Sequence, residues 1–185
     1  MSSPVISLLV VMGVSGCGKS SVGLALRDRL MQDNHQVCIY LDADHYHGQE
    51  NIDKMQRGIS LTDADRFPWL VRCQQAVSKE AEASVNKLTI ILACSALKKK
   101  YRKVLIDNDK YSTIFIYLKC SKDEIKQRQA YRIGHFFNPD LIDSQFSTLE
   151  EPDPKNEPKV IVVDGDQRPV SAVVSIIQDA LSYYE

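Results

Sequence analysis

The chain has 185 residues, of which 44% are hydrophobic, and a formal net charge of −1 at pH 7. Because this length is typical of one domain, we expect a single domain over residues 1–185. The near-neutral charge argues against a nucleic-acid partner, and no apolar run approaches the roughly 20 residues of a membrane-spanning helix. Five scattered cysteines without a C-x-x-C pair favour reduced thiols in a cytoplasmic protein over disulfides or a zinc site.

Apolar runs with strand composition alternate with segments of helical periodicity along the chain. Strands are expected at about residues 5–12, 36–41, 88–93, 113–118 and 159–163. Helices are expected at about residues 19–33, 49–57, 63–86, 97–108, 121–131, 140–149 and 169–183. Thr62 is a candidate cap for the third helix, while Pro68 inside it predicts a late start or a bend. The alternation predicts a parallel sheet covered by helices on both faces, with ligands beyond the carboxyl ends of the strands.

A G-x-x-x-x-G-K-S motif joins the first strand to the first helix. Its glycines let backbone N–H groups close on phosphate oxygens, and the following helix directs the positive end of its dipole at the same anion. We expect Lys19 to reach the β- and γ-phosphates of ATP and Ser20 to bind Mg²⁺. A chance glycine turn is the alternative, but strand, loop and helix all agree with the motif. The nucleotide-binding residues that it predicts are Gly13, Val14, Ser15, Gly16, Cys17, Gly18, Lys19, Ser20 and Ser21.

Two carboxylates, Asp42 and Asp44, follow the second strand. Their spacing points both side chains the same way in an extended chain, so that one can hold the metal while the other accepts a proton from a hydroxyl. A solvated acidic turn is the alternative. His45 and His47 raise a second one, a transition-metal site, but the phosphate loop favours Mg²⁺ and its oxygen ligands. His47 is then either a substrate hydrogen-bonding residue or a structural histidine.

Further candidates follow in the middle of the chain. Arg66 is either paired with the acids that flank it or a planar clamp for a substrate carboxylate. Ser95, after the third strand, can cap the next helix or contact the substrate, and the basic run at residues 98–102 can be a solvated face. Cys94 is a weak candidate nucleophile, because phosphoryl transfer from ATP to a hydroxyl needs no covalent step.

A lid is predicted at about residues 128–143. Arg128 and Arg132 are four residues apart and share a helix face, which suits arginines that close over a transferring phosphoryl group. The alternative is that Arg128 pairs with Glu124, one turn earlier. The polar turn after the last strand places Gln167 where it can border an adenine.

Together these residues resemble the gluconokinase family, the D-gluconate kinases related to shikimate kinase. The motifs that carry the resemblance are MGVSGCGKS (12–20), the D-x-D with His47, NIDKM (51–55), LTDADRFPWL (61–70), CSALKKKYR (94–102), GHFF (134–137) and SQFSTLEEP (144–152). The resemblance implies that ATP and D-gluconate react with Mg²⁺ to give ADP and 6-phosphogluconate. It also implies a three-layer α/β P-loop kinase fold with a five-stranded parallel sheet of order 2-3-1-4-5, a lid, and a homodimer.

The resemblance also implies roles for individual residues. Asp44 would be the base or substrate anchor, Asp42 the acid on the metal side and Arg66 a sugar-acid binder. The catalytic set is then Lys19, Asp44 and Arg132, with Ser20 and Asp42 on the metal. The substrate set is Asp44, His47, Arg66, Ser95, Arg132 and His135, and Arg128 and Gln167 join the nucleotide set. Cys17 stands where the family usually has serine or another small residue, which predicts a thiol open to oxidation.

Three other functions fit less well. A shikimate kinase should have G-G-G after the third strand, where Cys94-Ser95-Ala96 stands instead. A GTPase switch needs D-x-x-G and N-K-x-D motifs, which the sequence lacks. A catalytically dead scaffold should have lost Lys19, Asp44 or the lid arginines, and all are present.

Overall fold

A five-stranded parallel sheet forms the centre of the computed structural model, which describes residues 5–34, 37–130, 139–157 and 159–184. The strands are β1 (Ile6–Met12), β2 (Val37–Asp42), β3 (Leu88–Ala93), β4 (Ser112–Lys119) and β5 (Val160–Asp164). Their order in the sheet is β2-β3-β1-β4-β5, and every neighbouring pair is parallel. This order confirms the predicted one.

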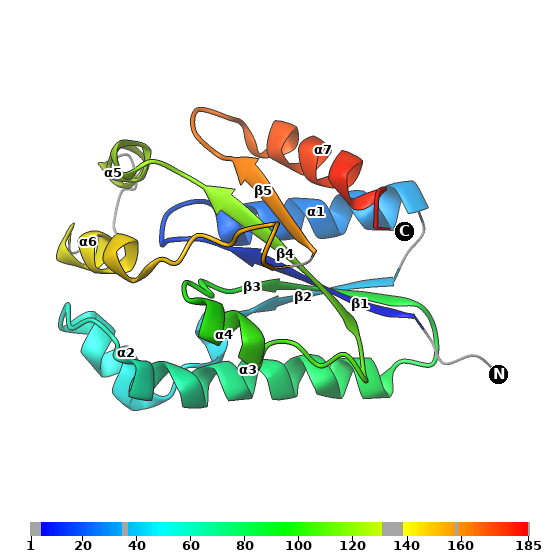
Figure 1. Ribbon diagram of the computed structural model, residues 1–185, viewed down its shortest axis with the longest axis horizontal. Helices are drawn as coiled ribbons and strands as arrows, with labels where there is room; N and C mark the ends of the chain where they lie inside the picture. Colours follow the sequence, from blue (N-terminus) through cyan, green and yellow to red (C-terminus); the bar gives the residue numbers. More distant parts are fainter. Residues whose placement is uncertain (1–4, 35–36, 131–138, 158, 185) are drawn as a thin grey trace.

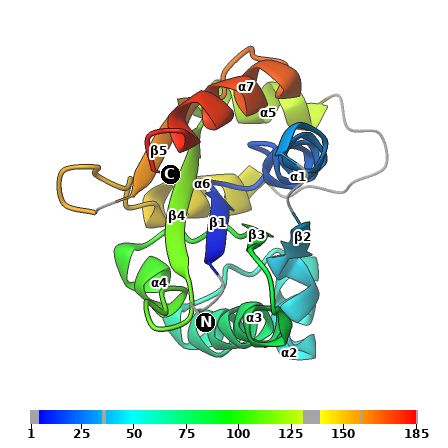
Figure 2. The same cartoon turned by 90° about the vertical axis from the view of Figure 1, so that its right-hand side faces the viewer.

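Helices cover both faces of the sheet. They are α1 (Lys19–Asn34), α2 (Gln49–Gln56), α3 (Asp63–Ala83), α4 (Lys99–Val104), α5 (Lys122–Ala130), α6 (Pro139–Thr148) and α7 (Val170–Leu181), with a 3₁₀ helix η1 (Ala43–Tyr46). Helices α1 and α7 lie on one face, and α3 and α4 lie on the other (Figures 1 and 2). None of the helices in the described part of the chain is long and apolar enough to cross a membrane. The result is the predicted three-layer arrangement.

The structure fixes where two of the predicted helices begin and end. Helix α3 begins at Asp63, as in the predicted span of 63–86, so of the two outcomes drawn from Pro68, a late start or a bend, the late start is wrong. A capping box fixes this start, because the Thr62 hydroxyl accepts from the Asp65 N–H at 3.3 Å while Asp65 Oδ2 accepts from the Thr62 N–H at 2.9 Å. Helix α4 spans only residues 99–104 and is shorter than predicted, because the chain turns at Asp107, whose carbonyl accepts from the Tyr111 N–H at 3.0 Å.

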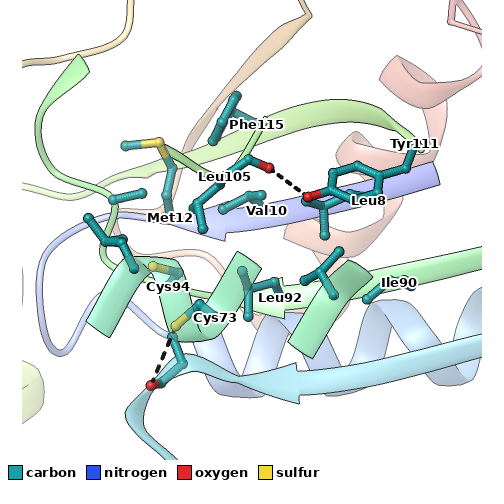
Figure 3. Packing of buried hydrophobic residues seen from close by; sticks show 14 of the residues in the cluster. Leu8, Val10, Met12, Cys73, Ile90, Leu92, Cys94, Leu105, Tyr111 and Phe115 are labelled. Carbon is teal, nitrogen blue, oxygen red and sulfur yellow. Dashed lines mark hydrogen bonds between the residues drawn. The ribbon is translucent and has the colours of Figure 1, made fainter. Parts of the chain in front are cut away.

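Two apolar layers hold the sheet between the helices. Alternate residues of β1 face opposite ways, so that Leu8 and Val10 pack toward α3 while Leu9 packs toward α1 and α7. Figure 3 shows the α3 side, where Cys73 lies beside strand residues such as Leu92. The packed sheet brings the carboxyl ends of its strands to one edge, where α2, α5 and α6 also lie (Figure 1). The candidate functional residues sit at that edge.

Candidate active site

The loop between β1 and α1 has a backbone that requires glycine. Gly13, Gly16 and Gly18 have φ angles of 142°, 87° and 99°. A Cβ at Gly13 would lie 2.8 Å from Cys17 Sγ and 2.9 Å from the Leu118 carbonyl oxygen, closer than real side chains approach. The loop therefore folds tightly against the end of β4 and leaves no room for a side chain at Gly13.

Lys19 and Ser20, which the sequence predicts for the phosphates and the metal, are the first two residues of α1. Lys19 Nζ donates to the Val14 carbonyl at 3.0 Å, which folds its side chain back over the loop. The Ser20 hydroxyl donates to Asp42 Oδ2 at 3.0 Å. These contacts join the start of α1 to the end of β2, as the sequence predicts for a phosphate and magnesium site.

Asp42 is held by several donors. Its Oδ2 also accepts from the Tyr40 hydroxyl at 3.0 Å, and its Oδ1 accepts from the Asp44 N–H at 3.0 Å. Burial raises the pKa of Tyr40 to about 12, so the phenol keeps its proton and remains a donor. Asp42 and the Ser20 hydroxyl therefore present oxygen atoms in a fixed arrangement, and oxygen ligands are the type that Mg²⁺ prefers.

Asp44 lies at the surface beside a buried histidine. Its side chain is 86% exposed, and its Oδ1 lies 4.0 Å from Nε2 of His47, whose side chain is only 5% exposed. The His47 ring stacks on Trp69 with centroids 4.3 Å apart. Burial is the main cause that lowers the pKa of His47, which therefore stays neutral at neutral pH.

The hydrogen bonds of His47 define its tautomer. Asn51 Nδ2 donates to the Asp65 carbonyl at 3.0 Å, which fixes the orientation of the Asn51 amide. The same nitrogen lies 3.3 Å from His47 Nδ1, so Nδ1 accepts and the ring proton is on Nε2, which faces Asp44. No group of three or more His, Cys, Asp or Glu side chains in the described ranges could hold a metal ion.

Arg66 is buried, and the two acidic residues near it in sequence, Asp63 and Asp65, are paired with lysines. Its Nε donates to the Leu61 carbonyl at 3.3 Å, and its guanidinium lies 5.9 Å from the centre of the Tyr101 ring. The flanking acids contact other cations. Asp63 binds Lys98, Lys100 and the Tyr101 hydroxyl, and these bonds, above all that of Lys100, hold its pKa well below the usual range. Lys54 Nζ donates to Asp65 at 2.6 Å. Both flanking acids thus form ion pairs with lysines, while the Arg66 side chain donates to the Leu61 carbonyl.

The segment after β3 is tied to the phosphate loop. The Ser95 carbonyl accepts from the Gly13 N–H at 3.3 Å, which places Ser95 next to the front of that loop. Burial raises the pKa of Cys94 to about 12, which excludes it as a thiolate nucleophile at neutral pH. Cys17 is 2% exposed and burial raises its pKa, so the expectation of a thiol open to oxidation is wrong.

A cavity of about 550 Å³ opens beside the loop, between α1, α5 and the turn after β5. Residues that line it include Gly16, Gly18, Ser21, Arg128, Gln167 and Val173. Its size and its position next to the phosphate loop suit the base and sugar of a nucleotide. Gln167 and Ser21, both predicted to contact the nucleotide, line this cavity.

Arg128 forms one wall of this cavity. It donates to Glu124 Oε1 at 2.7 Å, to the Cys17 carbonyl at 3.0 Å and to the Gly165 carbonyl. The predicted alternative, pairing with Glu124, is therefore present, and the same side chain also reaches the phosphate loop. The other lid candidates, Arg132 and His135, lie outside the described residues.

The sequence reasoning missed two residues of the site. Tyr40 holds Asp42 from within β2, and Gln145 of α6 accepts from the Ser15 N–H at 2.7 Å. Gln145 belongs to the SQFSTLEEP motif, which carries part of the family resemblance. The sequence signal for its role is that this polar residue lies on the same helix face as the apolar residues Ile142 and Leu149.

Comparisons with known proteins agree with this geometry. A family model described as adenylylsulphate kinase matches residues 6–134. The thermoresistant gluconokinase of Escherichia coli (strain K12) is 42% identical over 173 residues, which cover 92% of this chain and 91% of that protein. The gluconokinase of Gluconobacter oxydans (strain 621H) is 38% identical over 170 residues, with coverages of 92% and 89%.

A solved structure is similar over the same length. The crystal structure of a gluconokinase from Sinorhizobium meliloti 1021 has a TM-score of 0.77 and 34% sequence identity, and the match covers 96% of this chain and 95% of that one. Phosphate loop, sheet order, sequence identity and coverage all agree. The chain therefore belongs to the gluconokinase family of P-loop kinases.

Proposed function

We propose that this protein is a gluconokinase, which transfers the γ-phosphoryl group of ATP to D-gluconate and yields ADP and 6-phospho-D-gluconate. The observation that carries the proposal is that two pairs of polar side chains lie close together at the end of β2. In the first pair, the Ser20 hydroxyl at the end of the phosphate loop bonds Asp42. In the second, Asp44 lies beside His47 in the segment that follows Asp42. One pair suits a nucleotide with its metal, and the other suits a hydroxyl acceptor.

The nucleotide side uses the phosphate loop and the cavity beside it. Gln167 would border the base of ATP in this cavity and the loop would hold its phosphates. Lys19, which now donates to the Val14 carbonyl, would contact the β- and γ-phosphates. Ser20 and Asp42 would hold Mg²⁺, because both present oxygen ligands. Mg²⁺, when bound, neutralises charge on the phosphate oxygens. Arg128 closes the cavity wall.

The acceptor side uses Asp44, His47 and Arg66. Asp44 is exposed to an incoming substrate and accepts the proton of the attacking hydroxyl. His47 is neutral and donates from Nε2–H to a gluconate hydroxyl. Arg66 binds the gluconate carboxylate with its planar guanidinium, and Ser95 lines the same side next to Gly13.

Several predictions extend this proposal beyond the described geometry. Arg132 and His135 remain predicted lid residues that contact the phosphoryl group and the substrate. We also retain a single domain, a homodimer, a cytoplasmic location, and the absence of nucleic-acid and membrane partners as predictions. The five cysteines, all free and buried, are compatible with a reducing compartment.

The direct test is ADP release with different acceptors. Purified protein with ATP and Mg²⁺ is supplied with D-gluconate, other aldonic acids, shikimate, adenylylsulphate or no acceptor. We expect turnover with D-gluconate far above every other condition. Adenylylsulphate is included because the matching family model carries that description.

Each outcome has a definite meaning. Turnover with another aldonic acid would keep the mechanism and replace the substrate. Turnover with adenylylsulphate or shikimate instead of gluconate would refute the proposal. ADP release without any acceptor would identify an ATPase rather than a gluconokinase.

A further inference from the structure

A glutamine from α6 reaches the phosphate loop from 130 residues away in sequence. The Ser15 N–H donates to Gln145 Oε1 at 2.7 Å. Because a backbone N–H can only donate, the amide oxygen must be the atom that faces Ser15. The NH₂ group of Gln145, with its two donor hydrogens, therefore lies on the side of the amide away from the loop nitrogen.

The position of Gln145 is fixed by the packing of α6. Ile142 is 3% exposed, and Phe146 and Leu149 pack on the same core cluster that contains α1 and α7. Ile142 lies three residues before Gln145 and Leu149 four residues after it, so both share its helix face. The Gln145 side chain is half-buried there, and the Ser15 N–H gives its amide oxygen a partner.

The chain beyond α6 anchors the helix to the substrate side of the site. The Glu150 N–H donates to the Leu97 carbonyl at 2.8 Å, and Glu150 Oε2 accepts from the Lys99 N–H at 2.8 Å. Leu97 follows Ser95 in the segment after β3, and Lys99 begins α4. The glutamine is thus held between the substrate loop and the phosphate loop.

Ser15 lies on the acceptor side of the phosphate loop. Two residues before it, the Gly13 N–H bonds the Ser95 carbonyl, whereas the nucleotide cavity begins at Gly16. The neighbouring Val14 carbonyl binds Lys19, the residue assigned to the β- and γ-phosphates. Gln145 therefore contacts the part of the loop nearest to the transferring phosphoryl group.

We propose that Gln145 is a further residue of the phosphoryl-transfer site, with Oε1 holding the Ser15 corner of the loop and Nε2 donating to an oxygen of the γ-phosphoryl group. This inference rests on the proposed function only in requiring ATP as the phosphoryl donor. The neutral NH₂ group would stabilise negative charge on the γ-phosphoryl oxygens together with Lys19. It adds no second positive charge to the loop when no nucleotide is bound.

Three variants separate the two halves of the amide. Gln145→Glu keeps an acceptor for the Ser15 N–H but replaces the NH₂ donor with an anionic oxygen. Gln145→Met has similar length and neither group. Ser147→Ala is the matched control, because the Ser147 hydroxyl lies on the same helix and donates to the Asp143 carbonyl within it at 2.9 Å.

The readouts are kcat, KM for gluconate, thermal midpoint, and the dissociation constants of ATP and ADP. We expect Gln145→Glu to lower kcat at least tenfold. The dissociation constant of ATP should rise at least fivefold more than that of ADP, because only ATP carries the γ-phosphoryl group. Gln145→Met should lower kcat about tenfold with KM for gluconate within threefold of wild type. Ser147→Ala should match wild type in both assays.

Opposite results would overturn the inference. Full turnover and an unchanged ATP-to-ADP affinity ratio in Gln145→Glu would show that Nε2 contacts no phosphoryl oxygen. If Gln145→Met lowers the thermal midpoint and changes nothing else, Gln145 contributes to packing and stability but not to phosphoryl transfer. If wild type phosphorylates no gluconate, the proposed function fails, but the nucleotide affinity ratio still decides the role of Gln145.

Discussion

Replacing Gly23 by alanine should disturb the metal side of the site through a tyrosine ring. A Cβ on Gly23, within α1, would lie 2.8 Å from Tyr40 Cε2 and 3.5 Å from Ile91 Cγ2. Contacts below 3.0 Å force a shift, and the Tyr40 ring is the movable partner. Since the Tyr40 hydroxyl bonds Asp42 Oδ2 at 3.0 Å, the shift loosens the carboxylate that also binds Ser20.

The effects on stability and on metal binding should differ in size. Alanine gains about 1 kcal/mol of helix propensity over glycine, while overpacking costs about 1–3 kcal/mol. The net loss of unfolding free energy is therefore about 0–2 kcal/mol, which corresponds to a fall in Tm of at most about 8 °C for a chain of this size. Loss of one hydrogen bond to a charged group, about 1.5 kcal/mol, would weaken Mg²⁺ binding roughly tenfold.

The assay is turnover against free Mg²⁺ at saturating ATP and gluconate, with Tm measured in parallel. Tyr40→Phe is the matched control, because it removes the hydroxyl without changing the packing on Gly23. Both variants should move the Mg²⁺ midpoint upward by a similar factor. An alanine variant with a higher Tm and an unchanged midpoint would refute the idea that Tyr40 transmits packing at Gly23 to Asp42.

Three further predictions concern a base, a buried ion pair and an acid transition. Asp44→Asn should lower kcat by about 10²–10⁴ while ATP binding measured by calorimetry stays intact, and turnover within tenfold of wild type would rule out a general base. Arg102 is 1% exposed and binds Glu157 through two bonds of 2.6 and 2.7 Å, so Arg102→Ala should cost about 3–5 kcal/mol in denaturant unfolding, because the partner charge is left unpaired. The bond from Lys54, and then those from the capping box, lower the pKa of Asp65 from 3.8 to about 2; its stabilisation is therefore present above about pH 3.8 and lost as the pH falls toward 2. Circular dichroism of Asp65→Asn should show a weaker pH dependence of Tm in that window, and an unchanged dependence would contradict the assignment.

The fold could be predicted because its signals are local. Each strand is a short apolar run, and β3 is buried along its whole length, as expected between two helical layers. Helix α3 starts at its predicted cap, Thr62, and the late start drawn from Pro68 is wrong because a proline in the second turn removes only one helical bond. The end of α4 was missed because Leu105 and Tyr111 are buried beyond it, and their packing, not helix propensity, decides where the chain turns.

The placement of the phosphate-loop residues was also predictable, because a strand, a glycine loop and a helix fix one another's geometry over a few residues. The contacts that brace the loop were not, because they join segments far apart in sequence. Arg128 was weighed as either an ion-pair partner or a lid residue, and tertiary packing lets it bond Glu124, Cys17 and Gly165 together. An arginine has five N–H donors, so bonding to Glu124 one turn earlier does not prevent Arg128 from bonding other parts of the site as well.

Gln145 suggests how such contacts can be sought in other sequences. Its neighbours Ile142 and Leu149 mark one helix face as packed on the core, and a glutamine on that face is partly withdrawn from water. A partner must then come from another element, and the loops at the carboxyl ends of parallel strands are rich in free N–H groups. A polar residue on an apolar helix face near such an edge therefore predicts a bond to the ligand-binding loop, although the particular loop nitrogen follows only from the folded arrangement.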